Sequence, residues 1–166
     1  MKKKTLVCLC LILPAQIAAA TENWGLDVQK NPIDDTTTAS AYLFANEEVQ
    51  AWPKKTQPIL SVRCKSKKTE VFMGAGTNFD VEYGNSDSAH LIIRLDKQKA
   101  YTVNASQSTD GKAAFIPSPV KFAKKLLTAQ TLLIGFTPFN SSPVVATFNV
   151  GGNKAALEEV RKTCKW

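Results

Sequence analysis

The pair Cys64 and Cys164 constrains the fold of this chain more than any other feature of its sequence. The chain contains four cysteines, but Cys8 and Cys10 lie in an N-terminal segment typical of an export signal. Once that segment is removed in an oxidising compartment, the two remaining cysteines predict a disulfide. Such a bond closes a loop of about 100 residues, for which loop-closure theory gives about 4–5 kcal/mol of stabilisation. The alternative is two free buried thiols, and a redox pair is disfavoured because no C-x-x-C motif is present.

Residues 1–20 predict that the protein is exported. Met1–Lys4 is positively charged, residues 5–13 are almost wholly apolar, and Ala18–Ala20 is a small-residue cleavage site. This order is typical of a cleaved secretory signal, and the apolar run is shorter than the roughly 20 residues that span a bilayer. We therefore expect a mature chain of residues 21–166 that begins at Thr21 and is located in the periplasm.

Two alternatives to a cleaved signal are weaker. An uncleaved membrane anchor is opposed by Pro14 and Gln16, which interrupt the apolar run. A lipoprotein signal is opposed by Leu9, because lipid-modifying processing requires a small residue immediately before the modified cysteine.

Residues 21–166 are long enough for one domain with its own core. Removal of the three lysines in the signal lowers the formal net charge from +7 to +4. That charge is spread over short clusters, which favours solubility and gives no indication of a nucleic-acid partner. No stretch of the mature chain is apolar enough to form a transmembrane segment.

Alternating apolar and polar residues predict a chain composed mainly of short strands. In one predicted strand Leu60, Val62 and Cys64 share a face, and in another Leu91, Ile93 and Leu95 share a face opposite His90. The predicted strands are residues 36–44, 58–64, 69–75, 79–83, 89–96, 100–105, 112–116, 131–137 and 144–150.

Two segments carry helical spacing. Residues 119–130 place Phe122 and Leu126 on one side, and residues 153–162 place Leu157 and Val160 on one side, with Asn153 as a candidate N-cap. The fold class is therefore α+β and mainly β, with a β-sandwich-like core and two short helices. Because Cys64 ends a strand and Cys164 ends the last helix, the disulfide is expected to tie the C-terminal helix to the sheet.

No pattern of residues predicts a catalytic, cofactor or metal site. His90 is the single histidine, and a lone histidine in an alternating strand is more often a surface side chain than a catalyst. No serine lies in a G-x-S-x-G context. Asp34 and Asp35 form an acidic pair, but neighbouring residues of a strand point to opposite faces, so we expect a turn there. Gly74–Gly76 lacks the Lys-Ser/Thr of a phosphate loop and also predicts a turn.

Two basic clusters are candidates for contact with an anionic envelope component, such as lipid head groups or a polysaccharide. A solvated turn and a solvated helix face are the favoured explanation of the two clusters. The clusters are Lys65/Lys67/Lys68 and Lys121/Lys124/Lys125.

An ordered set of landmarks across the mature chain resembles the type VI secretion-associated family called VasI or TagO. The Arg-Cys … Cys-x-Trp bracket carries most of this resemblance. The landmarks are Trp24, Asn31–Thr36, Leu60–Cys64, Thr69–Phe72, Ile93–Asp96, Phe148–Gly152 and Cys164–Trp166. The resemblance implies an exported accessory protein encoded beside a contractile secretion apparatus, and it implies no catalytic activity or ligand.

The sequence therefore favours a non-enzymatic periplasmic accessory protein that binds a protein of the secretion machinery or another envelope component. One alternative is an enzyme that modifies the cell wall or a polysaccharide through a carboxylate site. Another is a secreted inhibitor or immunity protein that acts by occlusion. Convergent carboxylates with raised pKa values would favour the enzyme, and an exposed apolar patch would favour a binding protein.

Overall fold

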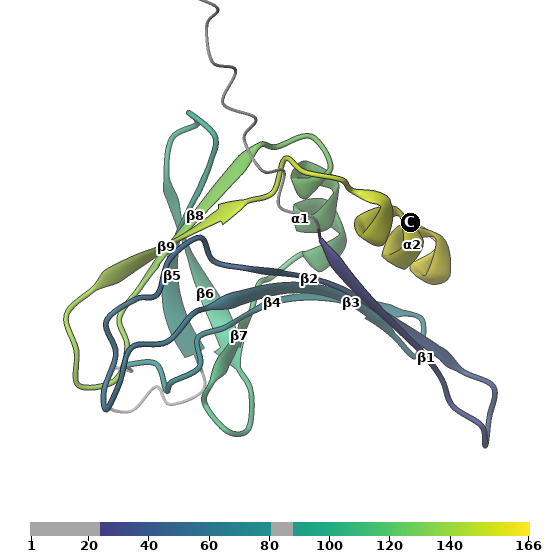
Figure 1. Cartoon of the computed structure of the whole chain (residues 1–166), viewed down its shortest axis with the longest axis horizontal. Helices are drawn as coiled ribbons and strands as arrows, with labels where there is room; N and C mark the ends of the chain where they lie inside the picture. Colours follow the sequence, from purple (N-terminus) through teal and green to yellow (C-terminus); the bar gives the residue numbers. More distant parts are fainter. Residues whose placement is uncertain (1–23, 81–87) are drawn as a thin grey trace, which may run out of the picture.

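A computed structural model describes residues 24–80 and 88–166 of the chain (Figure 1). Within these residues, nine antiparallel strands form one sheet in the order β1-β2-β3-β4-β7-β6-β5-β8-β9. The strands are β1 (Gly25–Lys30), β2 (Thr37–Phe44), β3 (Ile59–Lys65), β4 (Lys68–Gly74), β5 (Ser88–Leu95), β6 (Tyr101–Gln107), β7 (Ala113–Phe115), β8 (Thr131–Phe136) and β9 (Val144–Asn149).

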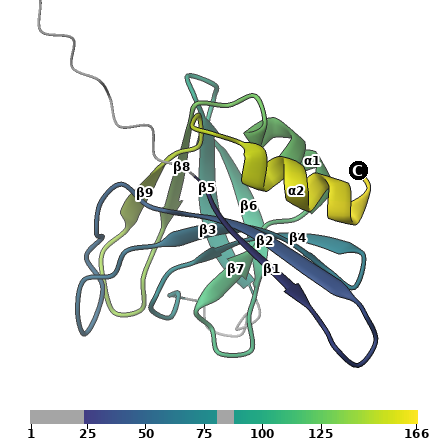
Figure 2. The same cartoon turned by 45° about the vertical axis from the view of Figure 1, so that its right-hand side comes forward.

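The sheet bends so strongly that its two halves pack on each other. Strands β1–β4 cross the direction of β5, β6, β8 and β9 in both views (Figures 1 and 2). The end of β2 reaches β9, where the amide of Asn46 donates to the carbonyl oxygen of Thr147 at 2.8 Å. A single apolar cluster fills the space between the halves. The predicted fold class, mainly β with a sandwich-like core, is confirmed.

Alternation along the strands selects the core residues as the sequence predicts. Leu60, Val62 and Cys64 are fully buried. On β5, Leu91 and Ile93 are buried while His90 is exposed. Because side chains alternate between the faces of a strand, one set of residues forms the core and the other faces outward.

Two helices cover the part of the curved sheet that its second half leaves open. Helix α1 (Pro119–Leu126) packs on β4, and helix α2 (Ala155–Cys164) packs on β2 and β3 (Figure 2). The residues of β2 that enter the core include the small Ala39 and Ala41, and short side chains let a helix approach closely. Neither helix of the described residues is long and apolar enough to cross a membrane.

Helix α1 differs at one end from its predicted range of residues 119–130, and helix α2, at Ala155–Cys164, differs at both ends from its predicted range of residues 153–162. Helix α1 ends at Leu126 rather than Gln130, and the hydroxyl of Thr128 donates to the carbonyl oxygen of Lys125 just beyond it. Helix α2 begins at Ala155, so Asn153 is not the N-cap residue. Its side-chain oxygen instead accepts a hydrogen bond from the amide of Ala155 at 3.0 Å.

Two strands differ from the prediction: one was not predicted, and one predicted strand is described only in part. Strand β1 was not predicted, and it forms the edge of the sheet beside β2. The predicted strand at residues 79–83 is described only at Phe79 and Asp80, where Phe79 forms an isolated bridge with Pro138. Its remaining residues, like the predicted signal at 1–20, lie outside the described part of the chain.

Candidate functional site

The disulfide predicted from the sequence joins β3 to the end of α2. Cys64 and Cys164 are bonded, with their α-carbons 5.5 Å apart. Cys64 is fully buried on β3, and the helix residues Leu157 and Val160 are buried on the same side as Cys164. The bond is a structural link between α2 and the sheet.

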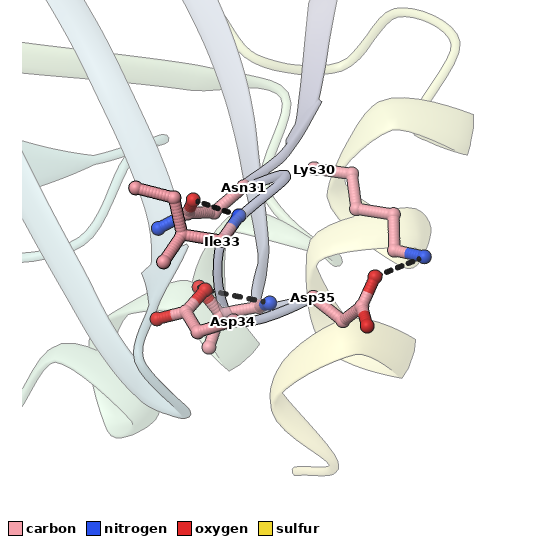
Figure 3. Close-up of polar contacts among 6 residues, drawn as sticks. Lys30, Asn31, Ile33, Asp34 and Asp35 are labelled. Carbon is pink, nitrogen blue, oxygen red and sulfur yellow. Dashed lines mark hydrogen bonds and ion pairs between the residues drawn. The ribbon is translucent and has the colours of Figure 1, made fainter.

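The candidate acidic pair forms the tip of the hairpin between β1 and β2 (Figure 3). Asp34 accepts hydrogen bonds from the amide and the hydroxyl of Thr36, at 3.0 and 2.7 Å, and these bonds lower the pKa of its carboxyl group. Asp35 instead pairs with Lys30 at 2.7 Å. The two carboxylates therefore serve separate turn contacts, as the prediction of a turn requires.

The other candidates lie apart from one another. His90 is exposed on β5. Ser66 and Lys67 have φ angles of 50° and 62°, so the first basic cluster is a hairpin turn of the kind that needs two left-handed residues. In the second cluster, the side-chain nitrogen of Lys125 lies 5.3 Å from the centroid of the Tyr101 ring. None of these residues joins a wider constellation of reactive groups within residues 24–80 and 88–166.

Four loops meet at the opposite end of the sheet from the helices and line an open cavity of about 950 Å³. We call this cavity the loop-end pocket. The loops follow β2, β4, β6 and β8, and they lie at the lower left of the molecule in Figure 1. The pocket is lined by Trp52, Pro53, Lys54, Thr56, Gly76–Phe79, Ser106–Lys112 and Phe139.

Trp52 and Phe139 form an aromatic corner on the pocket. Their ring centroids are 6.5 Å apart and their planes meet at 71°. Both rings are half exposed, at 56% and 50% of their full area, although large aromatic side chains are usually buried. The corner therefore offers two apolar surfaces to solvent, inclined to each other by 71°.

Backbone contacts fix the two loops that carry these rings. The hydroxyl of Thr77 donates to the carbonyl oxygen of Trp52 at 3.2 Å. The amide of Phe139 donates to the carbonyl oxygen of Asn78 at 2.8 Å. Val49 and Thr56 exchange two backbone hydrogen bonds, which close the base of the loop that carries Trp52. These bonds pre-organise the corner before any ligand arrives.

The loop between β6 and β7 forms the polar wall of the pocket. One carboxylate oxygen of Asp110 accepts hydrogen bonds from the hydroxyl of Ser108 and from the amide of Lys112, and these bonds lower the pKa of the Asp110 carboxyl group. The side-chain nitrogen of Asn78 donates to the carbonyl oxygen of Asp110 at 3.2 Å. Gly111 has a φ angle of 67°, and a β-carbon there would lie 2.7 Å from that nitrogen, so the wall requires glycine at this position.

Two side-chain polar atoms in the pocket wall are buried without a hydrogen-bond partner in the described structure. They are the hydroxyl oxygen of Thr56 and the side-chain nitrogen of Gln107. An unsatisfied buried polar atom costs about 1–3 kcal/mol. A hydrogen-bonding ligand that reached either atom after a small side-chain rotation would recover part of that free energy.

The described lining of the pocket carries several kinds of chemical group. Asp110 is the one carboxylate among the described lining residues. No cluster of three or more potential metal-ligating side chains occurs in the described residues. The site therefore combines aromatic surface with hydroxyl, amide, carboxylate and ammonium groups.

Sequence reasoning missed this pocket because its parts lie far apart along the chain. Residues 52, 78, 110 and 139 meet only after the sheet has folded. The available signal was local: Trp52 and Phe139 are aromatic residues in segments that otherwise predict polar loops, and such residues in loops often mark binding surfaces.

No family model and no curated protein sequence matches this chain. A crystal structure of invasion-associated protein B from Bartonella henselae is similar in fold, with a TM-score of 0.52 and 14% sequence identity. The match covers 89% of this chain and 100% of that one. At this identity the likeness extends to the fold alone, and the resemblance to the VasI/TagO family stays a prediction.

Proposed function

We propose that this chain is an exported, non-enzymatic accessory protein that acts in the periplasm by binding a component of the secretion machinery or of the cell envelope. The observation that carries the proposal is the aromatic corner of Trp52 and Phe139 on the loop-end pocket. Exposed tryptophan and other aromatic residues on a rigid frame are typical centres of binding energy. The pocket is the contact surface in this proposal.

The electrostatics of the pocket support a role without catalysis. The low pKa of Asp110 keeps its carboxyl group ionised at neutral pH, so it holds no proton to donate. A general acid of a glycoside hydrolase instead needs a raised pKa. Enzymatic modification of a polysaccharide is the rival that this feature disfavours.

Two likenesses supply the context of the proposal. The sequence landmarks that resemble VasI/TagO point to a type VI secretion apparatus. The structural neighbour is named for association with invasion. We extend a comparable accessory role to this chain only as part of the proposal, and the disulfide is compatible with an oxidising, extracytoplasmic compartment.

Site-specific photo-cross-linking tests the proposal in the native cell. A photoreactive amino acid replaces Thr109, an exposed residue of the pocket lining, in the full-length chain, and a matched variant carries it at Ile92, which is exposed to 55% on β5. We expect the protein in the periplasmic fraction, beginning at Thr21, and a discrete cross-linked product from position 109 that position 92 does not give. Cytoplasmic retention, or identical products from both positions, would contradict the proposal.

The same experiment separates the rivals. A cross-linked partner that is itself a secreted enzyme, inhibited by addition of this protein, would place the chain among inhibitors or immunity proteins. Conversion of an envelope saccharide by the purified protein, lost in Asp110→Asn, would make it an enzyme. Either outcome would replace the accessory role.

A further inference from the structure

We propose that the loop-end pocket is an oligosaccharide-binding site in which sugar rings stack on Trp52 and Phe139. This inference rests on the proposed function and specifies the class of envelope component that is bound. A pyranose ring has apolar C–H faces and a rim of hydroxyl groups. A complementary site therefore needs aromatic surface beside groups that both donate and accept hydrogen bonds.

The aromatic corner meets the first requirement. The ring faces carry negative partial charge, which attracts the slightly positive C–H groups of a sugar face. The 71° angle between Trp52 and Phe139 lets one ring lie beneath a sugar while the other contacts its side. Because the carrying loops are held by hydrogen bonds from Thr77 and to Asn78, little ordering cost remains to be overcome on binding.

The polar wall meets the second requirement with groups of mixed type. Only one oxygen of Asp110 takes part in the described hydrogen bonds, so the other can accept bonds from sugar hydroxyls. Asn78 uses one of its two N–H groups, toward the carbonyl oxygen of Asp110, and retains a second donor and an acceptor. Lys54 and Lys112 add donors from either side of the wall. Such a set satisfies hydroxyl groups, which themselves donate and accept.

The size of the pocket favours an oligosaccharide over a single sugar. Its volume of about 950 Å³ lies near the upper limit of small-molecule sites, which hold about 300–1,000 Å³. An apolar peptide is the competing occupant. It fits less well because Asn78, Ser108 and Asp110 would lose water without gaining matched partners.

Titration of the purified mature protein with two defined probes tests the inference. The probes are cellotetraose and tetra-N-acetylchitotetraose, whose equatorial β-1,4 linkages leave the ring faces open to stacking. Trp52 is the most exposed of the three tryptophans, so its fluorescence reports binding, and calorimetry confirms the stoichiometry. We expect at least one probe to bind with a Kd of about 0.1–1 mM, a range typical of weak binding.

Matched variants assign the binding to the corner. Trp52→Ala and Phe139→Ala should each weaken binding by roughly tenfold or more, as removal of a central aromatic contact does. Ile92→Ala, which removes an equally exposed apolar side chain from β5, should bind as the wild type does. Thermal unfolding checks that each variant is folded, and amide chemical-shift changes in the wild-type protein map the site if either aromatic variant fails to fold.

Three results would overturn the inference. The first is no binding of either probe at about 10 mM, well above the expected Kd. The second is unchanged binding in both Trp52→Ala and Phe139→Ala. The third is chemical-shift changes confined to other surfaces. If position 109 still cross-links specifically to a protein in the cell, the proposed function stands while the saccharide class is rejected.

Discussion

The two ends of the bent sheet are closed in different ways. At the helix end, α1 and α2 cover the sheet, and a covalent bond fixes Cys164 to Cys64. At the loop end, four loops surround a cavity and are joined by hydrogen bonds, with no disulfide among them in the described residues. One end is packed with regular structure, and the other exposes two aromatic rings to solvent.

This difference suggests a division of tasks between the ends. Helices and buried apolar residues such as Leu157 supply stability at the first end. Loops on a rigid frame tolerate exposed functional side chains, because the frame carries the folding free energy. Perturbations of the two ends should therefore have separable effects on stability and on binding.

Cys164→Ser is expected to have the largest effect on stability and to break the helix end. Removal of a disulfide that closes so long a loop should lower the free energy of unfolding by about 2–5 kcal/mol. Helix α2 has ten residues and would be marginal without its contacts, so its amides should exchange with solvent before those of β5. Urea denaturation and hydrogen exchange measure both effects.

A double variant, Cys64→Ser with Cys164→Ser, provides the control for Cys164→Ser. It removes the unpaired thiol, and added reductant should leave its stability unchanged while destabilising the wild type. Rapid labelling of two thiols per chain in the native, unreduced wild-type protein would contradict the intramolecular bond. An intermolecular dimer on a non-reducing gel would contradict it equally.

The helix end could be predicted because its signals are local or covalent. Alternation placed Leu60, Val62 and Cys64 on one face, and helical spacing placed Leu157 and Val160 on another; both faces are buried. The cysteine count then joined the two elements. Strand β1 escaped prediction because it begins at Gly25, a residue that weakens a strand. The fold needs glycine there, since a β-carbon would lie 2.3 Å from the ring of Tyr42.

The loop end could not be predicted because its geometry is set by tertiary contacts. Neither Trp52 nor Phe139 belongs to a periodic segment, and their proximity depends on the crossing of the two sheet halves. The wall at Asp110 lies between the predicted strands at residues 100–105 and 112–116, which the structure pairs as β6 and β7. Its proximity to Asn78, which lies beyond β4, follows from β4 pairing with β7, a register that no single-sequence pattern specifies.

Gly111→Ala is expected to disturb the loop end while leaving the helix end intact. The left-handed backbone at residue 111 costs an alanine about 1–2 kcal/mol, and the new β-carbon would displace the side chain of Asn78. Equilibrium denaturation measures the loss of stability. Hydrogen exchange should show faster exchange at residues 108–113 and unchanged exchange in α2.

A double-mutant cycle with Asn78→Ala separates the two causes in Gly111→Ala. Asn78→Ala removes the steric conflict but not the backbone strain. The double variant should therefore lose less stability than the sum of the losses in the two single variants. Wild-type stability in Gly111→Ala would contradict the account of the wall. Loss of α2 protection would contradict the independence of the two ends.

Acid titration is expected to give the smallest effect and to sharpen the comparison, because the loop end and the helix end each contain a carboxylate with a lowered pKa, in addition to Asp34 in the β1–β2 hairpin. At the helix end, Asp96 accepts hydrogen bonds from the amides of Thr131 and Gln130, at 2.8 and 2.9 Å, and these lower its pKa with help from the charge of Lys154. At the loop end, the hydroxyl of Ser108 and then the amide of Lys112 lower the pKa of Asp110.

The sign of the pH dependence follows from these shifts. A carboxyl group whose pKa is lower in the folded state binds its proton more readily when unfolded, so its stabilisation is fully present above the unfolded value of about 3.9. It is lost as the pH falls through the folded pKa. The wild-type protein should therefore lose stability below about pH 4, and Asp96→Asn or Asp110→Asn should each make that loss of stability less steep.

In an NMR titration, the amide of Thr131 should follow Asp96 and the amide of Lys112 should follow Asp110, each with a midpoint below that of a free aspartate. Titration of both amides with one common midpoint, or a steep acid loss retained in both variants, would mean that the two ends do not respond separately.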